Sequence, residues 1–152
     1  MGKEMTQSHD TRIDGQCLCG SVHVHLTDHR PEIGLCHCTM CRRWSGGIYA
    51  MFTAPATAVK ITGEVKVYRS SAFAQRAFCP TCGSGIWLRD DGSEEYEFCA
   101  GLFEAARDFA AISENYIDQR LTALTIQGDH KRVTAAEYEE KFPFVASDET
   151  PD

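Results

Sequence analysis

The sequence lacks any long apolar run. No stretch of the 152 residues approaches the roughly 20 consecutive apolar residues that a membrane-spanning helix requires. Residues 1–15 are polar and contain no apolar segment of the kind that forms the centre of a secretory signal. We therefore expect a cytoplasmic protein with no membrane partner.

The sequence is also poor in positive charge. It has 15 Lys and Arg residues against 22 Asp and Glu residues, which gives a formal net charge of -7 at pH 7. Such an excess of acid disfavours binding that depends on general attraction to phosphate. We therefore expect no nucleic-acid partner, and any anionic ligand must be attracted by a local positive charge.

The chain has the length of one ordinary domain, which can bury a core by itself. Its polar start and acidic end predict a flexible N-terminus at residues 1–14 and a flexible acidic tail at 146–152. Between them, residues 15–145 are expected to form a single domain. No whole unit of the sequence is repeated.

Alternation of apolar and polar residues dominates this domain and predicts a mainly β fold. Residues 102–111 have the composition of a helix, and a second helix is predicted at 134–142, where Thr134 and Glu137 form a capping box. Residues 113–120 fit either a strand or a lid. Strands are predicted at 21–27, 48–53, 58–61, 65–69, 84–89 and 95–100.

The eight cysteines are the feature least expected from composition. Disulfides are one explanation, but a C-x-C pair points two sulfurs at one ion more easily than at each other. All-sulfur tetrahedral sites suit zinc or iron, and nothing in the sequence indicates redox chemistry, so zinc is the expected metal. Cys99 stands alone, whereas the others form the clusters Cys17-x-Cys19, Cys36-x-Cys38-x-x-Cys41 and Cys79-x-x-Cys82.

Two arrangements divide the clustered cysteines between two zinc ions per chain. In the first, the outer two clusters form one closed structural site, and the middle cluster keeps an open fourth position. In the second, Cys99 closes that position and both ions are structural. Tyr96 and Phe98 alternate with Cys99, which favours a buried apolar thiol and hence the first arrangement. The four-sulfur cluster consists of Cys17, Cys19, Cys79 and Cys82, and the three-sulfur cluster of Cys36, Cys38 and Cys41.

Residues next to the three-sulfur cluster are candidate partners of a substrate. Zinc with three thiolates carries a charge of about -1, and a substrate thiolate makes it about -2, which a neighbouring cation stabilises. Arg42 and Arg43 are candidate catalytic residues for this role or for binding a carboxylate, and the alternative for at least one of them is a surface position. His37 is expected to face solvent or to lie behind the ligands. Core packing is favoured over ligand contact for each of the candidate pocket walls Trp44, Phe52, Trp87 and Tyr116.

The three cysteine motifs, in this order, resemble the glutathione-dependent formaldehyde-activating (GFA) family, also called the centromere-protein-V domain. Residues 115–118 are similar to a later segment of the family. Arg42-Arg43 stands where members close to the formaldehyde-activating enzyme tend to carry Trp-Lys. The matching segments span most of residues 15–89 and read Gln16-Cys17-Leu18-Cys19-Gly20, Cys36-His37-Cys38-Thr39-Met40-Cys41-Arg42-Arg43 and Phe78-Cys79-Pro80-Thr81-Cys82-Gly83.

The resemblance implies an Mss4-like fold of curled antiparallel β-sheets, to which the sequence adds one or two short helices near the C-terminus. It implies a structural zinc at the four-sulfur cluster and a catalytic zinc at the three-sulfur cluster. The implied reaction is addition of a small thiol, usually glutathione, to an aldehyde such as formaldehyde, which is carbon-sulfur lyase chemistry in the reverse direction. Alternatives from other classes are a non-catalytic zinc module that binds a protein or acts as a chaperone, and a methionine-sulfoxide reductase that uses Cys99.

Overall fold

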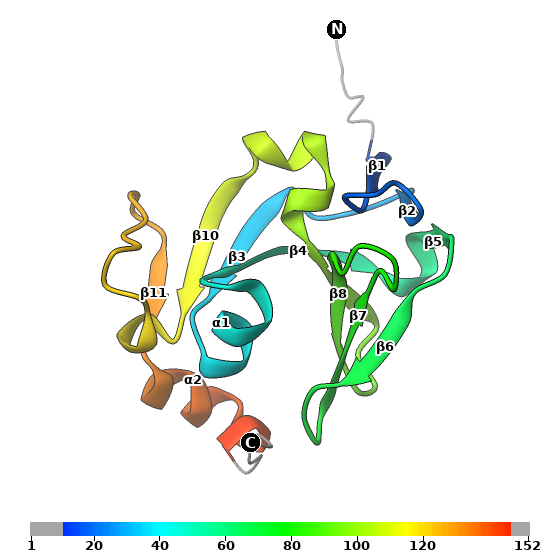
Figure 1. Cartoon of the computed structure of the whole chain (residues 1–152). Coiled ribbons are helices and arrows are strands. Elements are labelled where there is room, and N and C mark those ends of the chain that lie inside the picture. Colours follow the sequence, from blue (N-terminus) through cyan, green and yellow to red (C-terminus); the bar gives the residue numbers. More distant parts are fainter. Residues whose placement is uncertain (1–10, 147–152) are drawn as a thin grey trace, which may run out of the picture.

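The computed structural model describes residues 11–146 and consists mainly of β-strands in two sheets (Figure 1), as predicted. The smaller sheet has the order β1-β2-β5, and the larger has the order β11-β10-β3-β4-β9-β8-β7-β6. The strands are β1 (Ile13–Gln16), β2 (His23–Leu26), β3 (Glu32–Cys36), β4 (Tyr49–Pro55), β5 (Val59–Thr62), β6 (Lys66–Arg69), β7 (Ala74–Phe78), β8 (Gly85–Asp90), β9 (Glu95–Cys99), β10 (Ala110–Asn115) and β11 (Lys131–Val133).

The larger sheet curls around the short helix α1 (Thr39–Ser45). In Figure 1, β3 and β10 lie on one side of α1, and β6, β7 and β8 lie on the other. Neighbouring strands are antiparallel except that β10 pairs in parallel with both β3 and β11. No helix among residues 11–146 is long and apolar enough to cross a membrane, and the cytoplasmic location stays a prediction.

The termini are described only in part. Residues 1–10 and 147–152, which carry most of the two segments expected to be flexible, lie outside the described residues. Strand β1 begins at Ile13, inside the N-terminal segment that was expected to be flexible. The rest of that expectation stays a prediction.

The strands predicted from alternation are present. The strands predicted at 58–61 and 65–69 follow each other in sequence, but they belong to different sheets. β5 pairs with β2 in the smaller sheet, whereas β6 pairs with β7 at the edge of the larger one. Gly63 lies between them with φ of +92°, and a Cβ atom there would meet the carbonyl oxygen of Ser21 at 1.9 Å. Only glycine fits this crossing between the sheets.

The helix predicted at 102–111 is wrong. The segment forms the 3₁₀ turns η3 (Ala100–Leu102) and η4 (Glu104–Asp108), and β10 follows. The buried residues are Ala100, Phe103 and Ala106, and a spacing of three residues brings side chains to one face of a 3₁₀ turn. Burial of Phe103 against Phe52, with ring centroids 4.9 Å apart, therefore decides the conformation.

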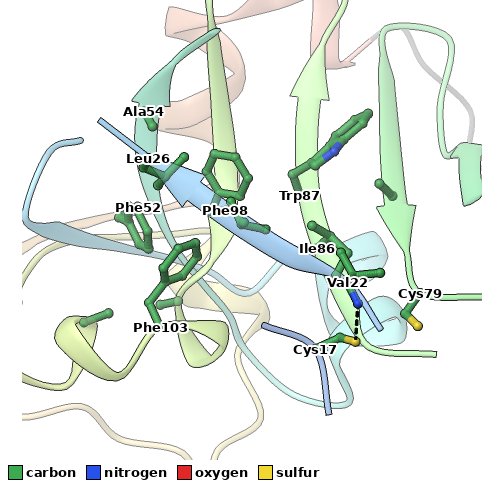
Figure 2. Packing of buried hydrophobic residues seen from close by; sticks show 14 residues of the cluster. Cys17, Val22, Leu26, Phe52, Ala54, Cys79, Ile86, Trp87, Phe98 and Phe103 are labelled. Carbon is green, nitrogen blue, oxygen red and sulfur yellow. Dashed lines mark hydrogen bonds between the residues drawn. The ribbon is translucent and has the colours of Figure 1, made fainter. Parts of the chain in front are cut away.

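The hydrophobic core lies between the two sheets and contains large side chains from both (Figure 2). Val22 and Leu26 from the smaller sheet and its preceding turn meet Phe52, Ile86 and Phe98 from the larger sheet. The same cluster includes Cys17 and Cys79, which are fully buried. The four-sulfur cluster is thus attached to the core.

The helix predicted near the C-terminus is confirmed as α2 (Ala135–Lys141). Thr134 Oγ1 accepts from the N–H of Glu137 at 3.2 Å, and the Glu137 carboxylate accepts from the N–H of Thr134 at 2.9 Å, which completes the capping box. The remaining elements are the helix α3 (Pro143–Ala146) and the 3₁₀ turns η2 (Ala56–Ala58) and η5 (Ile117–Gln119).

Candidate metal centres and active-site cavity

The four-sulfur cluster has the geometry of a tetrahedral metal site. Its four Sγ atoms all lie within 4.8 Å of one another. Cys17 Sγ lies 3.7 Å from Cys19 Sγ, which in turn lies 3.8 Å from Cys79 Sγ. Four sulfurs at about 2.3 Å from a tetrahedral zinc ion are about 3.8 Å apart, so this donor set fits zinc.

Backbone and hydroxyl donors surround the same sulfurs. Cys79 Sγ accepts hydrogen bonds from the N–H groups of Thr81 and Cys82, both at 3.4 Å. This requires the tight turn that ends at Gly83, whose φ is +82°. Ser21 Oγ lies 3.2 Å from Cys79 Sγ, and Ser84 Oγ lies 3.2 Å from Cys82 Sγ. Such donors stabilise sulfur in its thiolate form.

The three-sulfur cluster is built at one strand–helix junction. Cys36 ends β3, and Cys38 is the N-cap of α1, where its sulfur accepts from the N–H of Cys41 at 3.4 Å. The helix itself was not predicted, because its cysteine N-cap is not one of the usual capping residues. All three Sγ atoms lie within 4.8 Å of one another, and no fourth Cys, His, Asp or Glu of residues 11–146 joins them.

Proton sharing among these three thiols shows why a cation fits between them. Hydrogen bonds to Cys38 and Cys41 raise the pKa of Cys36 well above its ordinary value. The hydrogen bonds from Cys36 and Cys41 lower the pKa of Cys38 instead. One sulfur is thus ionised at the expense of its neighbours, and a bound metal ion is what allows all three to ionise together.

A cavity of about 220 Å³ opens beside the three-sulfur cluster, and all three of its cysteines line it. No cysteine of the four-sulfur cluster lines this cavity. Its walls come from both halves of the larger sheet and from α2. The lining residues used below are Tyr49, Arg76, Asp90, Glu97, Tyr116, Tyr138 and Glu139.

Arg76 on β7 is a charged residue of this wall that contacts the sulfurs. Its side chain is buried, and Nη2 lies 3.5 Å from Cys41 Sγ. The guanidinium carbon lies 5.7 Å from the ring centroid of Trp44 and 5.6 Å from that of Tyr49. Burial opposes its charge, but the neighbouring groups Cys41, Tyr49 and Cys38 together outweigh burial and raise the pKa of Arg76. Sequence reasoning missed Arg76. The signal that could have indicated it is an arginine at an inward position of a strand that leads into a cysteine motif.

Neither Arg42 nor Arg43 lines the cavity. Arg42 donates from Nε to the carbonyl oxygen of His37 at 3.1 Å and from Nη2 to Thr39 Oγ1 at 3.3 Å. Arg43 is exposed. The structure therefore brings Arg76, and not the two arginines that follow the cluster in sequence, to the cavity side of the sulfurs.

The candidate aromatic walls separate into two groups. Phe52 and Trp87 belong to the hydrophobic core, as favoured from the sequence. Trp44 lies beside Arg76 without lining the cavity, whereas Tyr116 lines it. Tyr116 has φ of 58° and donates from its hydroxyl to Glu139 at 3.1 Å, so the C-terminal helix α2 is tied to the cavity wall.

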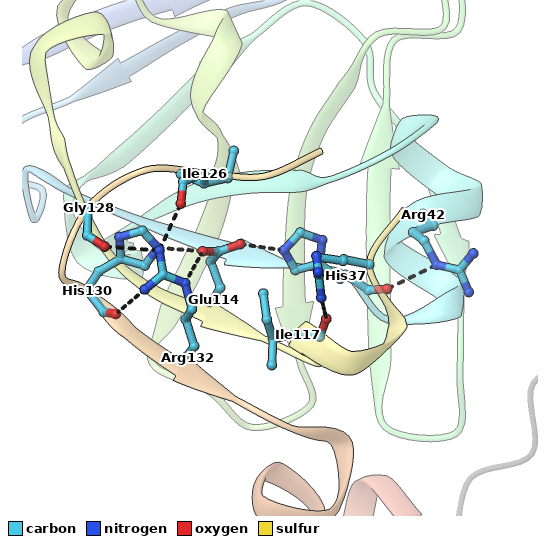
Figure 3. A network of polar contacts seen from close by, with 9 residues as sticks. His37, Arg42, Glu114, Ile117, Ile126, Gly128, His130 and Arg132 are labelled. Carbon is cyan, nitrogen blue, oxygen red and sulfur yellow. Dashed lines mark hydrogen bonds and ion pairs between the residues drawn. The ribbon is translucent and has the colours of Figure 1, made fainter. Parts of the chain in front are cut away.

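His37 lies behind the ligands and is fully buried, so the alternative in which it faces solvent is wrong. Its Nε2 lies 2.8 Å from Glu114 Oε1, and Glu114 is also bound by His130 at 2.5 Å and by Arg132 at 3.2 Å (Figure 3). Burial opposes ionisation of Glu114, but hydrogen bonds from His130 and His37 outweigh it and lower its pKa. This network holds the ligand-bearing turn against β10 and β11.

Cys99 is not part of either sulfur cluster. Its Sγ donates to the hydroxyl of Tyr49 at 3.7 Å. Burial raises the pKa of Cys99 to about 11. A thiol that stays protonated at neutral pH does not suit the attacking role that a sulfoxide reductase would require.

Two carboxylates in the cavity wall also have shifted pKa values. Burial raises the pKa of Glu97 to about 8, and the negative charge of Asp90 adds to the shift. Burial likewise raises the pKa of Asp90. Sequence reasoning missed both residues, because alternation places Glu97 on a strand without showing that its face borders a cavity.

Comparison with known proteins agrees with this geometry. The sequence profile of the family described as glutathione-dependent formaldehyde-activating enzyme matches residues 12–119. The chain belongs to the GFA family. The predicted family is thereby confirmed, and the matched region contains both sulfur clusters and Arg76. Helix α2, which contributes Tyr138 and Glu139 to the cavity, lies beyond the region that matches the GFA profile.

Two individual proteins resemble this GFA chain. A protein of Schizosaccharomyces pombe named as an uncharacterized lyase is 29% identical over 109 residues, which cover 70% of this chain and 80% of that protein. A crystal structure of a Rhodobacter sphaeroides protein superimposes with a TM-score of 0.52 at 23% identity and covers 65% of this chain and 99% of that one. The second likeness supports the fold alone.

Proposed function

We propose that this protein is a zinc-dependent enzyme of the carbon-sulfur lyase type that adds a small thiol to an aldehyde and catalyses the reverse reaction. The observation that carries the proposal is that one sulfur cluster is closed and the other is open to a cavity. Four sulfurs enclose one site, whereas three sulfurs leave the other facing a cavity. Three protein ligands and an accessible fourth position are typical of catalytic zinc.

The four-sulfur cluster is proposed to hold a structural zinc ion and the three-sulfur cluster a catalytic one. Zinc at the second cluster would supply a Lewis acid that favours the thiolate form of a substrate thiol at neutral pH. Cys36, Cys38 and Cys41 would hold that ion in the wall of the cavity. Arg76 lies within 3.5 Å of Cys41 Sγ and offsets the negative charge of the sulfurs.

The reaction requires both substrates to be held together. The substrate sulfur forms a bond to the carbonyl carbon, the π electrons of the carbonyl move to its oxygen, and that oxygen takes a proton. The reverse reaction breaks the same carbon–sulfur bond. Confinement of the thiol and the aldehyde in one cavity is expected to supply much of the rate acceleration.

The proposed substrates follow from the family and from the size of the cavity. Its volume of about 220 Å³ is small for a ligand site, since such sites are about 300–1,000 Å³. We propose that the thiol-bearing part of glutathione, or a smaller thiol, enters together with a small aldehyde such as formaldehyde. The reaction would then resemble that of an S-(hydroxymethyl)glutathione synthase.

Exchange NMR with ¹³C-labelled formaldehyde tests this proposal directly. The zinc-loaded protein is expected to accelerate exchange between formaldehyde hydrate and the thiol adduct for at least one of glutathione, cysteine and 2-mercaptoethanol. The Cys41→Ser variant should lose this acceleration, and the matched Cys99→Ser variant, whose sulfur lies outside both clusters, should retain it. No acceleration with any thiol, or full acceleration in Cys41→Ser, would contradict the proposal.

A further inference from the structure

Arg76 places a buried guanidinium with unused N–H groups in the wall of the cavity. Its side chain is 3% exposed. Nη2 is directed at Cys41 Sγ, while Nε and Nη1 have no hydrogen-bond partner among the described residues. Buried donors in native proteins are almost always satisfied by protein, water or a ligand. The free donors of Arg76 therefore need an oxygen partner, and a ligand bound in the cavity that Arg76 lines can supply one.

The position of these donors is fixed by their surroundings. The guanidinium lies between the rings of Trp44 and Tyr49, at 5.7 and 5.6 Å from their centroids. An arginine side chain held against aromatic rings presents its planar fork in one orientation. An oxygen that accepts a hydrogen bond from Nε or Nη1 is thus held against the same guanidinium whose third nitrogen, Nη2, contacts Cys41.

We propose that Arg76 is a catalytic residue that binds the oxygen of the aldehyde. This inference rests on the proposed addition of a thiol to an aldehyde. As the sulfur–carbon bond forms, the π electrons of the carbonyl move to its oxygen, and the N–H groups of Arg76 stabilise the negative charge there. Donors that are already oriented at the position where charge develops give the largest electrostatic contributions to catalysis.

The other charges in the cavity favour a carbonyl oxygen over a substrate carboxylate. The remaining charged side chains that line it are those of Asp90, Glu97 and Glu139, and all three are acidic. A carboxylate would meet repulsion from Asp90 and Glu139 as soon as it is bound, whereas a carbonyl oxygen acquires its charge only in the transition state, next to Arg76. An acid in the wall of the same cavity can also provide its proton. Burial raises the pKa of Glu97 to about 8, so its carboxyl group retains a proton at neutral pH.

Two Arg76 variants and a matched control test the inference by kinetics. Arg76→Lys keeps the positive charge beside Cys41 but loses the fork of donors, and Arg76→Gln loses both. Both are expected to lower kcat/KM for the aldehyde about 10²- to 10³-fold, the usual effect of removing an oxyanion donor. Arg69→Gln alters an exposed arginine on the neighbouring strand β6, which is paired with Asp91 just after the end of β8, and should stay near wild type. The affinity of zinc-loaded Arg76→Lys for the thiol, measured by calorimetry, is expected to change less than about threefold, roughly 0.7 kcal/mol.

A titration that needs no turnover provides the second test. In zinc-loaded Trp87→Phe the remaining tryptophan, Trp44, lies beside Arg76 and reports on its surroundings. We expect acetamide, a neutral carbonyl compound, to change the Trp44 fluorescence in a saturable manner, and we expect the change to be absent when Arg76→Gln is added. The same titration with acetate compares a carboxylate of similar shape.

The outcomes separate this inference from the proposed function. A response to acetate alone would assign Arg76 to a substrate carboxylate and overturn the inference. So would a response to acetamide that survives Arg76→Gln, or an Arg76→Lys variant that loses thiol affinity by the same factor as kcat/KM. If the wild type accelerates no thiol–aldehyde exchange, the proposed function fails, and a response to acetamide that depends on Arg76 would still show an oxygen-binding site.

Discussion

The two sulfur clusters use the same ligand atom and differ in the number of ligands and in the space beside them. The four-sulfur cluster joins segments that are about sixty residues apart in sequence, and two of its sulfurs are buried in the hydrophobic core. The three-sulfur cluster comes from one strand–helix junction and borders a cavity with a buried arginine. The ligand type therefore does not decide between a structural and a reactive site. The number of ligands and the space beside them do.

The largest expected effect is a contrast in stability between the clusters. Cys79→Ser removes a ligand from the cluster attached to the core, and the free energy of metal binding there contributes to folding. We expect its melting temperature to fall by at least roughly 10 °C, or about 3 kcal/mol, while that of Cys41→Ser changes by less than about half as much. Circular-dichroism melting of zinc-loaded samples checks this. A larger loss in Cys41→Ser would show that the roles of the two clusters are reversed.

The next effect concerns Glu97, a carboxylic acid in the wall of the cavity at the open site. Glu97 has a pKa of about 8 in the folded protein, above its ordinary value of 4.5. The folded state thus binds this proton more tightly, so the stabilisation is complete below about pH 4.5 and is lost as the pH rises to about 8. Between pH 6 and pH 9, unfolding by urea should show wild type losing about 2–3 kcal/mol more stability than Glu97→Gln.

The charged groups that act on Glu97 are Asp90, Arg76 and Glu95. Glu95→Gln serves as the control and should lose stability with pH as wild type does. Glu95 contributes least to the pKa shift of Glu97, and it lies at the start of β9. An equal loss of stability in wild type and Glu97→Gln would show that Glu97 is not the group that retains the proton.

A smaller effect is expected from the helix that lies beyond the family match. Thr134→Ala removes the N-cap of α2, which usually costs about 1 kcal/mol, and α2 carries Tyr138 and Glu139 to the cavity. We expect KM for the thiol to rise about two- to fivefold with little change in kcat. Thr134→Ser, which keeps the hydroxyl, is the matched control. An unchanged KM in Thr134→Ala would argue against α2 as a wall of the substrate site.

The smallest effect is expected at the two arginines next to the three-sulfur cluster in sequence. Arg43 is exposed and does not line the cavity, so Arg43→Gln should change kcat/KM by less than about threefold, or 0.7 kcal/mol. Arg42→Gln is expected to cost somewhat more, because Arg42 holds the carbonyl of His37 between two ligands. Steady-state kinetics of these two variants and of Arg76→Gln, measured in parallel, make the comparison. A loss of kcat/KM in Arg43→Gln equal to that in Arg76→Gln would contradict this prediction.

The sequence predicts the parts of this molecule that depend on local spacing. The cysteine motifs separate the sulfurs into the two clusters that the structure brings together, and the capping box at Thr134 locates α2. The spacing within each motif and the capping box depend on residues a few positions apart, whereas the joining of Cys17 and Cys19 to the motif about sixty residues later follows from counting ligands. The mainly β architecture also follows, because alternation is a local pattern.

The parts that depend on register between distant strands could not be predicted. Arg76 reaches the sulfurs only because the larger sheet curls and brings β7 opposite α1. His37 is buried because Glu114, 77 residues later, accepts its hydrogen bond. Residues 100–108 are 3₁₀ turns because Phe103 fills the core, although their composition favours a helix. In each case a tertiary contact outweighs the local signal.

The most direct test of the account is to count the metal ions and determine which of them responds to a thiol. The account predicts two zinc ions per chain and, after cobalt substitution, a change in the thiolate-to-cobalt absorption on addition of glutathione or 2-mercaptoethanol. Cys41→Ser should abolish this change while one metal ion remains bound. Two ions that do not respond to any thiol, or a full response that persists in Cys41→Ser, would contradict an open three-sulfur site.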